Sequence, residues 1–160
     1  SMLGGSITAL FVISLILIFA LRSLKMGLLS LIPNLFPAAM AFGLWGYFNG
    51  NVGLSIAIVL AMTLGIVVDD TVHFLSKYLR AQRELGMNSV EATRYAFRTV
   101  GVALSITSVT LVTGFGALAI SSFKVNSDMG LLSSVTIAFA LIADFLFLPP
   151  LLMKLDRNSK

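Results

Sequence analysis

Residues 53 to 75 read GLSIAIVLAMTLGIVVDDTVHFL, an apolar run that carries no charge until two adjacent aspartates, Asp69 and Asp70. A helix needs about 20 such residues to cross a hydrocarbon layer about 30 Å thick. No water is available at that depth, so the backbone groups have to be paired within the segment itself. The run therefore predicts a membrane-spanning α-helix and makes lipid the main solvent of this part of the chain.

The same composition extends over the whole chain of 160 residues, of which 58% are apolar and 11% are charged. The charges cluster between long apolar stretches, which excludes a soluble helical bundle. Five membrane spans are predicted, at residues 5 to 21, 27 to 48, 53 to 75, 101 to 121 and 129 to 153. Pro33 and Pro37 should bend the second span. The expected fold is all-α: a polytopic membrane protein whose residues 1 to 160 form one transmembrane domain.

The basic residues predict the orientation. Ten of the eleven Lys and Arg flank the helix ends of one side, and Lys124 alone falls on the other. By the positive-inside rule, the N-terminus and the loops at 49 to 52 and 122 to 128 should lie outside and the C-terminus in the cytoplasm. The expected location is the cell inner (cytoplasmic) membrane, with multiple passes. Membrane lipid explains the net charge of +4, so we expect no nucleic-acid partner.

A short helix is expected between the third and fourth spans. Gly86 should end the preceding helix, and Asn88 and Glu91 form a capping-box pattern that opens a new one over residues 89 to 99. Val90 and Phe97 fall on its apolar side, and Arg94 and Arg98 on its charged side. This pattern favours an interfacial helix along the inner leaflet. It could serve as a tether or transmit motion between the spans.

The two aspartates are the strongest functional signal. A charge at the bilayer centre costs about 2.5 to 3.5 kcal/mol, so two in succession demand a protein interior or a hydrated path. Asp69 and His73 lie one turn apart on one face, with Asp70 about 100° around the helix. Such a coupled pair can hold or release a proton in the membrane field, which predicts a proton relay at Asp69 and Asp70. Pairing with a cationic helix is the structural alternative, and His73 could equally have an interfacial or packing role.

Other polar side chains should reach the same depth as the doublet. Counted from the helix ends, they are Thr107, Ser108 and Thr110 in the fourth span and Asp144 in the fifth. We expect these groups to be able to meet. Asp144 could take part in ion transfer or accept hydrogen bonds from the hydroxyls as a fixed strut. The small residues Gly114 and Gly116, within a run of hydroxyl side chains, favour close helix packing.

Several functional classes are disfavoured. One histidine and no cysteine leave only carboxylates as strong metal ligands. No glycine-rich loop precedes a Lys-Ser or Lys-Thr pair, so an ATPase is not expected. We therefore expect no cofactor, no metal site and no enzymatic activity.

Four segments carry a family resemblance. They are Gly65-x-x-x-Asp69-Asp70 followed by Thr71 to Leu75, Ile32-Pro33-Asn34-Leu35-Phe36-Pro37, Thr113-Gly114-Phe115-Gly116, and Asp144-Phe145-Leu146-Phe147-Leu148-Pro149-Pro150. Together they resemble the resistance-nodulation-division (RND) superfamily, and specifically its lipid-exporting branch of MMPL and hopanoid-transporter proteins, which is akin to Patched and sterol-sensing domains. Gly65 belongs to the GxxxDD motif of that superfamily. We expect it to contribute to close helix packing, as Gly114 and Gly116 should.

The resemblance implies an exporter driven by the proton-motive force, with lipid or another hydrophobic molecule as substrate and Asp69 and Asp70 as proton-relay acids. It also implies partners. Such transporters have two six-helix halves, each with a large extracytoplasmic domain, and this chain corresponds to the last five helices of one half, expected to be the C-terminal one. A homo-oligomer could mimic the missing half. Two alternatives stay open: a sterol-sensing-like module that binds lipid without ion coupling, and a scaffold that only assembles with partner helices.

Overall fold

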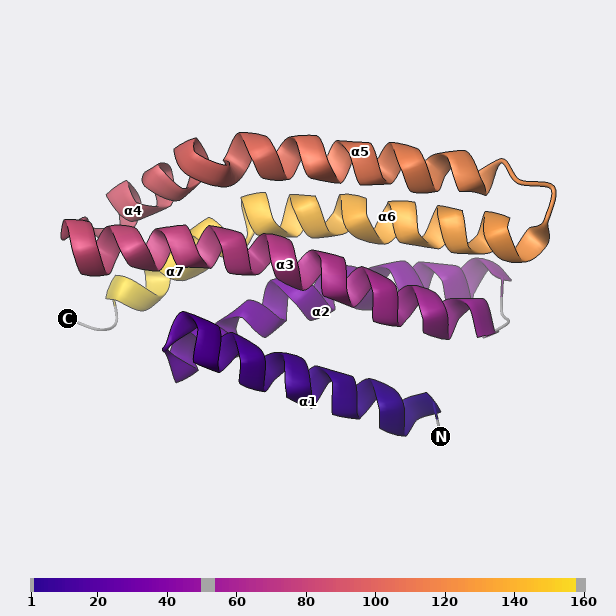
Figure 1. Cartoon of the computed structure of the whole chain (residues 1–160), viewed down its shortest axis with the longest axis horizontal. Coiled ribbons are helices and arrows are strands. Elements are labelled where there is room, and N and C mark those ends of the chain that lie inside the picture. Colours follow the sequence, from indigo (N-terminus) through magenta and orange to yellow (C-terminus); the bar gives the residue numbers. More distant parts are fainter. Residues whose placement is uncertain (1, 50–53, 158–160) are drawn as a thin grey trace.

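The computed structural model describes residues 2–49 and 54–157, and no strand occurs among them. The elements are α1 (Met2–Leu21), α2 (Leu24–Asn49), α3 (Leu54–Leu85), α4 (Ser89–Ala96), the π-helix η1 (Phe97–Gly101), α5 (Val102–Ala119), α6 (Lys124–Leu146) and α7 (Leu148–Arg157). The long helices run side by side, with α1 and α5 at opposite edges of the bundle (Figure 1). The all-α prediction is confirmed for the described residues.

Four helical stretches are long and apolar enough to cross a membrane: Leu24–Phe48, Ile58–Leu85, Ser89–Ala119 and Lys124–Leu155. The first predicted span is the exception. Its helix α1 has 20 residues, but only the shorter stretch Phe11–Leu21 stands out as an apolar helix in the described part. The count of five spans is therefore not established, although a multi-pass membrane fold is.

The helix expected at 89 to 99 begins as predicted but does not end there. Asn88 caps it: the Asn88 side chain accepts from the Glu91 N–H at 3.0 Å, and the Glu91 carboxylate accepts from the Asn88 N–H at 3.2 Å. From Ala96 the chain continues through the π-helical turn into α5, so one helix of 31 residues bends rather than breaks. Gly86, with φ +63°, ends α3 as expected.

The packed side of α4 differs from the predicted apolar side. Ala92, Ala96, Thr93 and Ser89 are buried, whereas Val90, which was expected on the apolar side, is exposed. Small side chains let α4 lie close against α3, whereas the larger Val90 turns away. Phe97 contacts Phe74 of α3 and Phe145 of α6 edge-on, at ring-centroid distances of 5.0 and 5.2 Å. The start of the α4–α5 helix is therefore fixed on the bundle.

Helix α6 occupies the middle of the bundle and packs against α2, α3 and α5. Its contact with α5 is the closest, because a Cβ at Gly130 would lie 2.5 Å from the Phe115 carbonyl oxygen. Ser127 and Ser134 flank Gly130 and donate to the carbonyls of Ala119 and Val112, at 2.7 and 3.0 Å. Three small residues of α6 thus form the seam with α5.

Several boundaries differ from the expected ones. α6 begins at Lys124, inside the predicted 122 to 128 loop, and the last predicted span is divided at Phe147, where α6 ends and α7 starts. Pro149 and Pro150 lie in the first turn of α7, where proline fits a helix. Pro33 and Pro37 both lie inside α2, which changes direction along its length (Figure 1). The predicted loop at 49 to 52 falls almost entirely outside the described residues.

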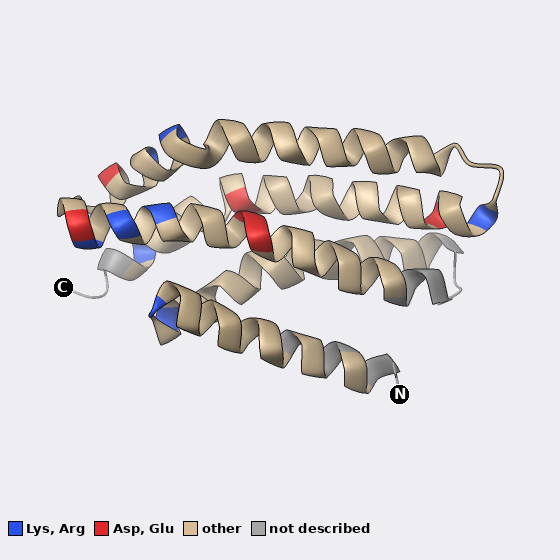
Figure 2. Cartoon of the chain, in the orientation of Figure 1, with Lys and Arg blue, Asp and Glu red and all other residues tan. Residues whose placement is uncertain are grey.

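The charges divide the bundle into two ends and a middle. Figure 2 shows the Lys and Arg residues gathered at one end, apart from the start of α6, whereas acidic positions of α3 and α6 lie next to each other midway along the bundle. This separation matches the distribution expected of a membrane protein, in which basic residues flank the spans. The acids in the middle define the site.

Candidate functional site

Asp70 lies on α3 and faces the interior. Only 8% of it is exposed, and its Oδ2 accepts a hydrogen bond of 3.2 Å from Ser108 of α5, which is fully buried. The predicted meeting of the doublet with span-four hydroxyls is thus confirmed for this pair. Because Ser108 and Asp70 belong to different helices, their contact joins α3 to α5 at membrane depth.

A second group of hydrogen bonds joins α3 to α2 and α6. Thr71 follows Asp70 on α3, and its Oγ1 lies 2.7 Å from Oδ1 of Asn34 on α2 and 3.0 Å from Oδ1 of Asp144 on α6. All three residues are buried, with Asp144 only 2% exposed. Asp144 therefore accepts from a hydroxyl, as expected, but from Thr71 of α3 rather than from α5.

This cluster has fewer hydrogen-bond donor hydrogens than acceptor oxygens. The Thr71 hydroxyl has one hydrogen, and three oxygens surround it: those of Asn34 and Asp144 and the Val67 carbonyl at 3.2 Å. The Asn34 amide nitrogen is buried with no partner, so a rotated amide could donate to Thr71 instead. A proton on Asp144 would equally complete the cluster. Either a rotated Asn34 amide or a proton on Asp144 would therefore supply the missing hydrogen.

Asp69 lies outside this buried cluster. Its carboxylate pairs with His73 at 3.6 Å, one turn along α3 as predicted, and the two side chains are 70% and 60% exposed. The adjacent acids of the doublet therefore face different surroundings: Asp70 points into the bundle, and Asp69 points out of it. A carboxylate and an imidazole at this depth are unfavourable toward lipid.

The remaining predicted residues do not join the cluster. Thr107 and Thr110 are exposed on α5 and donate to carbonyls of their own helix, at 2.9 and 2.8 Å. The predicted packing at Gly65 and Gly114 is wrong within this chain, because a Cβ at either would meet no atom within 4 Å. Gly116 has one ordinary contact, 3.8 Å from Ser134 Oγ.

Asn34 and Thr71 were not singled out as site residues from the sequence. Both occur in the segments that carry the family resemblance, and Asn34 is the one amide within an apolar span, between the two prolines. A polar amide at membrane depth is itself a signal for an interhelical contact. The signal for such a contact is weaker at Thr71, because buried threonines in helices often bond only their own backbone, as Thr63 does with Val59 at 2.6 Å.

Comparison with known proteins agrees with this architecture. Residues 2–158 match the model of the MMPL family. The chain is also 26% identical over 146 residues to MJ1562 of Methanocaldococcus jannaschii, which is named as a candidate membrane protein. The match covers 91% of this chain and 37% of that relative, so the chain spans little more than a third of the relative's length. Because the family model extends over nearly every residue, including all four helices that contribute side chains to the site, the chain belongs to the MMPL family.

Proposed function

We propose that this chain is the ion-coupling transmembrane module of an exporter that uses the proton-motive force to move lipids or other hydrophobic compounds. The observation that carries the proposal is the buried polar cluster, in which Asp70 and Asp144 are tied through Ser108, Thr71 and Asn34 to four different helices. A proton on Asp70 alters the contact between α3 and α5, and a proton on Asp144 alters the contacts among α2, α3 and α6. Membership of the MMPL family supports a transporter role.

The proposed coupling depends on whether the Asp70 carboxylate only accepts hydrogen bonds or also donates one. An ionised carboxylate only accepts hydrogen bonds, whereas a protonated one also donates. Protonation of Asp70 would weaken its hold on the Ser108 hydroxyl, 3.2 Å away, and so free α3 to move against α5. Each elementary charge that crosses the field releases about 2.3 kcal/mol per 100 mV. That energy is enough to shift a two-state equilibrium between helix arrangements nearly fifty-fold.

Asp69 has a different part in the proposal. Its exposed pair with His73 forms a polar strip on the outer side of α3, which needs cover other than lipid. We propose that a partner half of the transporter, or a second copy of this chain, covers the strip and encloses a water path there. Asp69 then passes protons between that path and Asp70. We further propose that the basic end of the bundle lies in the cytoplasm, as the positive-inside rule suggests, with the extracytoplasmic domains on the opposite side.

A lipid-binding module without ion coupling is the second candidate. The observation that favours it is an apolar cavity of about 280 Å³ between α2 and α6, lined by Trp45 and Phe48 on one side and Leu132 and Val135 on the other. A hydrophobic ligand could occupy this cavity without any change at the acids. The two candidates therefore predict different effects of neutralising the doublet.

The test is neutralisation of the acids in the complete transporter. Asp70→Asn and Asp69→Asn should each abolish gradient-driven export, because asparagine keeps the shape but cannot carry the proton. Asp128→Asn is the matched control: Asp128 lies near the start of α6 and pairs with Lys124 at 3.4 Å, away from the cluster. Export is measured as the appearance of labelled hydrophobic substrate outside energised cells. Full export by both doublet variants would refute proton coupling and favour the lipid-binding module.

A further inference from the structure

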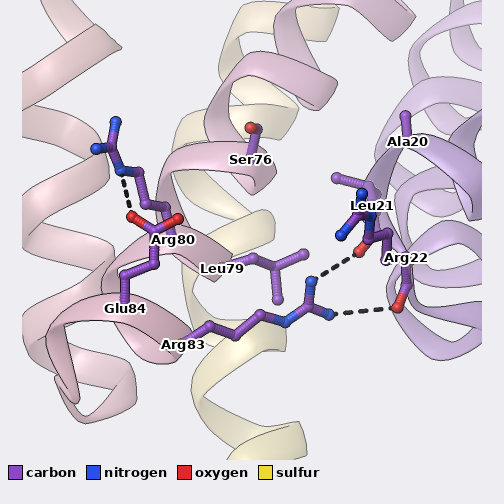
Figure 3. Close-up of a pocket in the computed structure, with 8 residues that line it drawn as sticks. All are labelled: Ala20, Leu21, Arg22, Ser76, Leu79, Arg80, Arg83 and Glu84. Carbon is purple, nitrogen blue, oxygen red and sulfur yellow. Dashed lines mark hydrogen bonds and ion pairs between the residues drawn. The ribbon is translucent and has the colours of Figure 1, made fainter.

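A polar cavity opens at the basic end of the bundle, between the end of α1 and the extension of α3 (Figure 3). Its volume is about 290 Å³. The lining residues are Ala20, Leu21 and Arg22 from the end of α1, and Ser76, Leu79, Arg80, Arg83 and Glu84 from α3. This cavity is separate from the buried acid cluster, and the proposed coupling does not use it.

Arg22 has an unusual place in this cavity. It connects α1 to α2 with φ +47°, a left-handed backbone conformation that glycine and asparagine adopt far more readily than arginine. No described residue forms a hydrogen bond or an ion pair with its guanidinium group. A long cationic side chain is therefore held, at a conformational cost, with its donors free at the cavity wall. Strain of this kind often marks a binding site.

Arg83 brings a second guanidinium group to the same place. It reaches from α3 to the end of α1 and donates to the carbonyls of Leu21 and Arg22, at 3.2 and 3.4 Å (Figure 3). Two of its five N–H donors have partners in this way, and the contacts hold the group in position. Arg80 is already paired with Glu84 at 2.8 Å. The three arginines and one glutamate leave the cavity with a net charge of +2.

The surface beside the cavity is apolar. On α1, Phe19 is 87% exposed and Ile16 is 60% exposed, within two turns of Arg22. A hydrocarbon chain that lies along this face would end with its polar group at the cavity. Positive charge next to an exposed apolar helix face, at the end of the spans, suits an amphiphile with an anionic head.

From this arrangement we propose that the cavity binds the phosphate of an anionic lipid headgroup. Arg22 and the free donors of Arg83 bind the phosphate oxygens, the Ser76 hydroxyl donates to the same group, and the acyl chains lie along α1. The bound lipid would fix the α1–α2 turn against α3. The site does not depend on the proposed export function, and it would exist whether or not the acid cluster carries protons.

The experiment is a lipid titration of the purified chain in detergent micelles, with bound lipid counted by native mass spectrometry. Dioleoylphosphatidylglycerol should bind, and dioleoylglycerol, which lacks the phosphate, should not. Arg22→Asn removes the charge and suits the left-handed backbone, so the chain should fold and its affinity for phosphatidylglycerol should fall about tenfold. Lys25→Asn is the matched control: it removes the same charge nearby but outside the cavity, and its effect should be at most about twofold.

A second variant keeps the proposal testable if Arg22→Asn fails to fold. Ser76→Leu fills the cavity without any change in charge and should reduce binding as Arg22→Asn does. Equal losses in Lys25→Asn and Arg22→Asn would show general charge attraction and overturn the site. Displacement of phosphatidylglycerol by equimolar glycerol 3-phosphate would show a site for soluble phosphate and overturn its assignment to lipid.

Discussion

At the scale of single residues, neighbouring side chains on α3 point toward different surroundings. Asp69 faces outward, Asp70 faces α5, and Thr71 faces α2 and α6. Successive residues on a helix differ by about 100°, so three consecutive polar residues span about 200° of its circumference. A helix that carries such a triplet has less than half of its circumference free of polar side chains at that level. This explains why α3 lies among other helices at the level of the doublet.

Thr71 provides a test of the cluster as a structural unit. Thr71→Val keeps the shape but removes the hydroxyl that lies within 3.0 Å of both Asn34 and Asp144, so we expect a loss of about 1–2 kcal/mol in the free energy of unfolding. Thr63→Val is the matched control, because Thr63 is equally buried on the same helix but bonds only its own backbone. Unfolding by sodium dodecyl sulfate in mixed micelles, followed by Trp45 fluorescence, measures both. Equal losses would show that the interhelical bonds add no stability.

At the scale of elements, the seam between α5 and α6 depends on one glycine. A Cβ at Gly130 would lie 2.5 Å from the Phe115 carbonyl oxygen and 2.6 Å from the Ala119 nitrogen. Both are backbone atoms of α5, which cannot move aside as the tip of a flexible side chain can. Gly114, on α5 itself, has open space where its side chain would be. Close packing of the two helices therefore requires glycine at position 130 of α6 but not at position 114 of α5.

Gly130→Ala should therefore destabilise the chain by about 1–3 kcal/mol, because the helices must separate to admit the methyl group. Gly114→Ala is the matched control and should change stability by less than about 1 kcal/mol, in the stabilising direction, since alanine favours the helix over glycine. Thermal unfolding in detergent, followed by circular dichroism, compares the two variants. A Gly130→Ala chain as stable as Gly114→Ala would mean that the seam is looser than described.

How far the sequence predicts these elements depends on the signal that each one carries. The capping box at Asn88 and the helix end at Gly86 have local causes, so they were predicted correctly. The π-helical continuation into α5 was not, because Arg94 and Arg98 suggested a separate surface helix. Membrane helices are apolar on their lipid-facing and protein-facing sides alike, so periodicity does not reveal which glycine packs. For this reason Gly65 and Gly114 were chosen and Gly130 was missed.

The same limit applies to the candidate site. The depth of Asp70, Ser108 and Asp144 follows from counting residues along each helix, and their common level was therefore predictable. The rotation of each helix about its axis does not follow from such counting. Which of two adjacent aspartates faces inward depends on that rotation, as does the choice of Thr71 rather than an α5 hydroxyl as the partner of Asp144. Interhelical packing decides both, and no local pattern encodes it.

At the scale of the whole molecule, one side of the bundle exposes polar residues in the middle of its helices. Gly65, Asp69 and His73 follow one another at intervals of one turn along α3, and all three are exposed. The middle of α5 is also largely exposed, including the hydroxyl residues Thr107 and Thr110. The strip on α3, with its carboxylate and imidazole, is poorly suited to lipid. We therefore expect protein to cover it, supplied by a second copy when the chain is expressed alone.

This expectation can be tested by cross-linking, because the chain has no cysteine of its own. Gly65→Cys introduces a thiol on the strip, where its side chain has open space, one turn from Asp69. Phe19→Cys is the control, since Phe19 is 87% exposed on α1 at the far edge of the bundle. Oxidation in native membranes should give a disulfide-linked dimer with Gly65→Cys and monomer with Phe19→Cys, because only facing thiols come within about 6 Å between Cα atoms. Dimers in equal yield from both positions would indicate random collision in the membrane, and monomers from both would show that no second copy covers the strip.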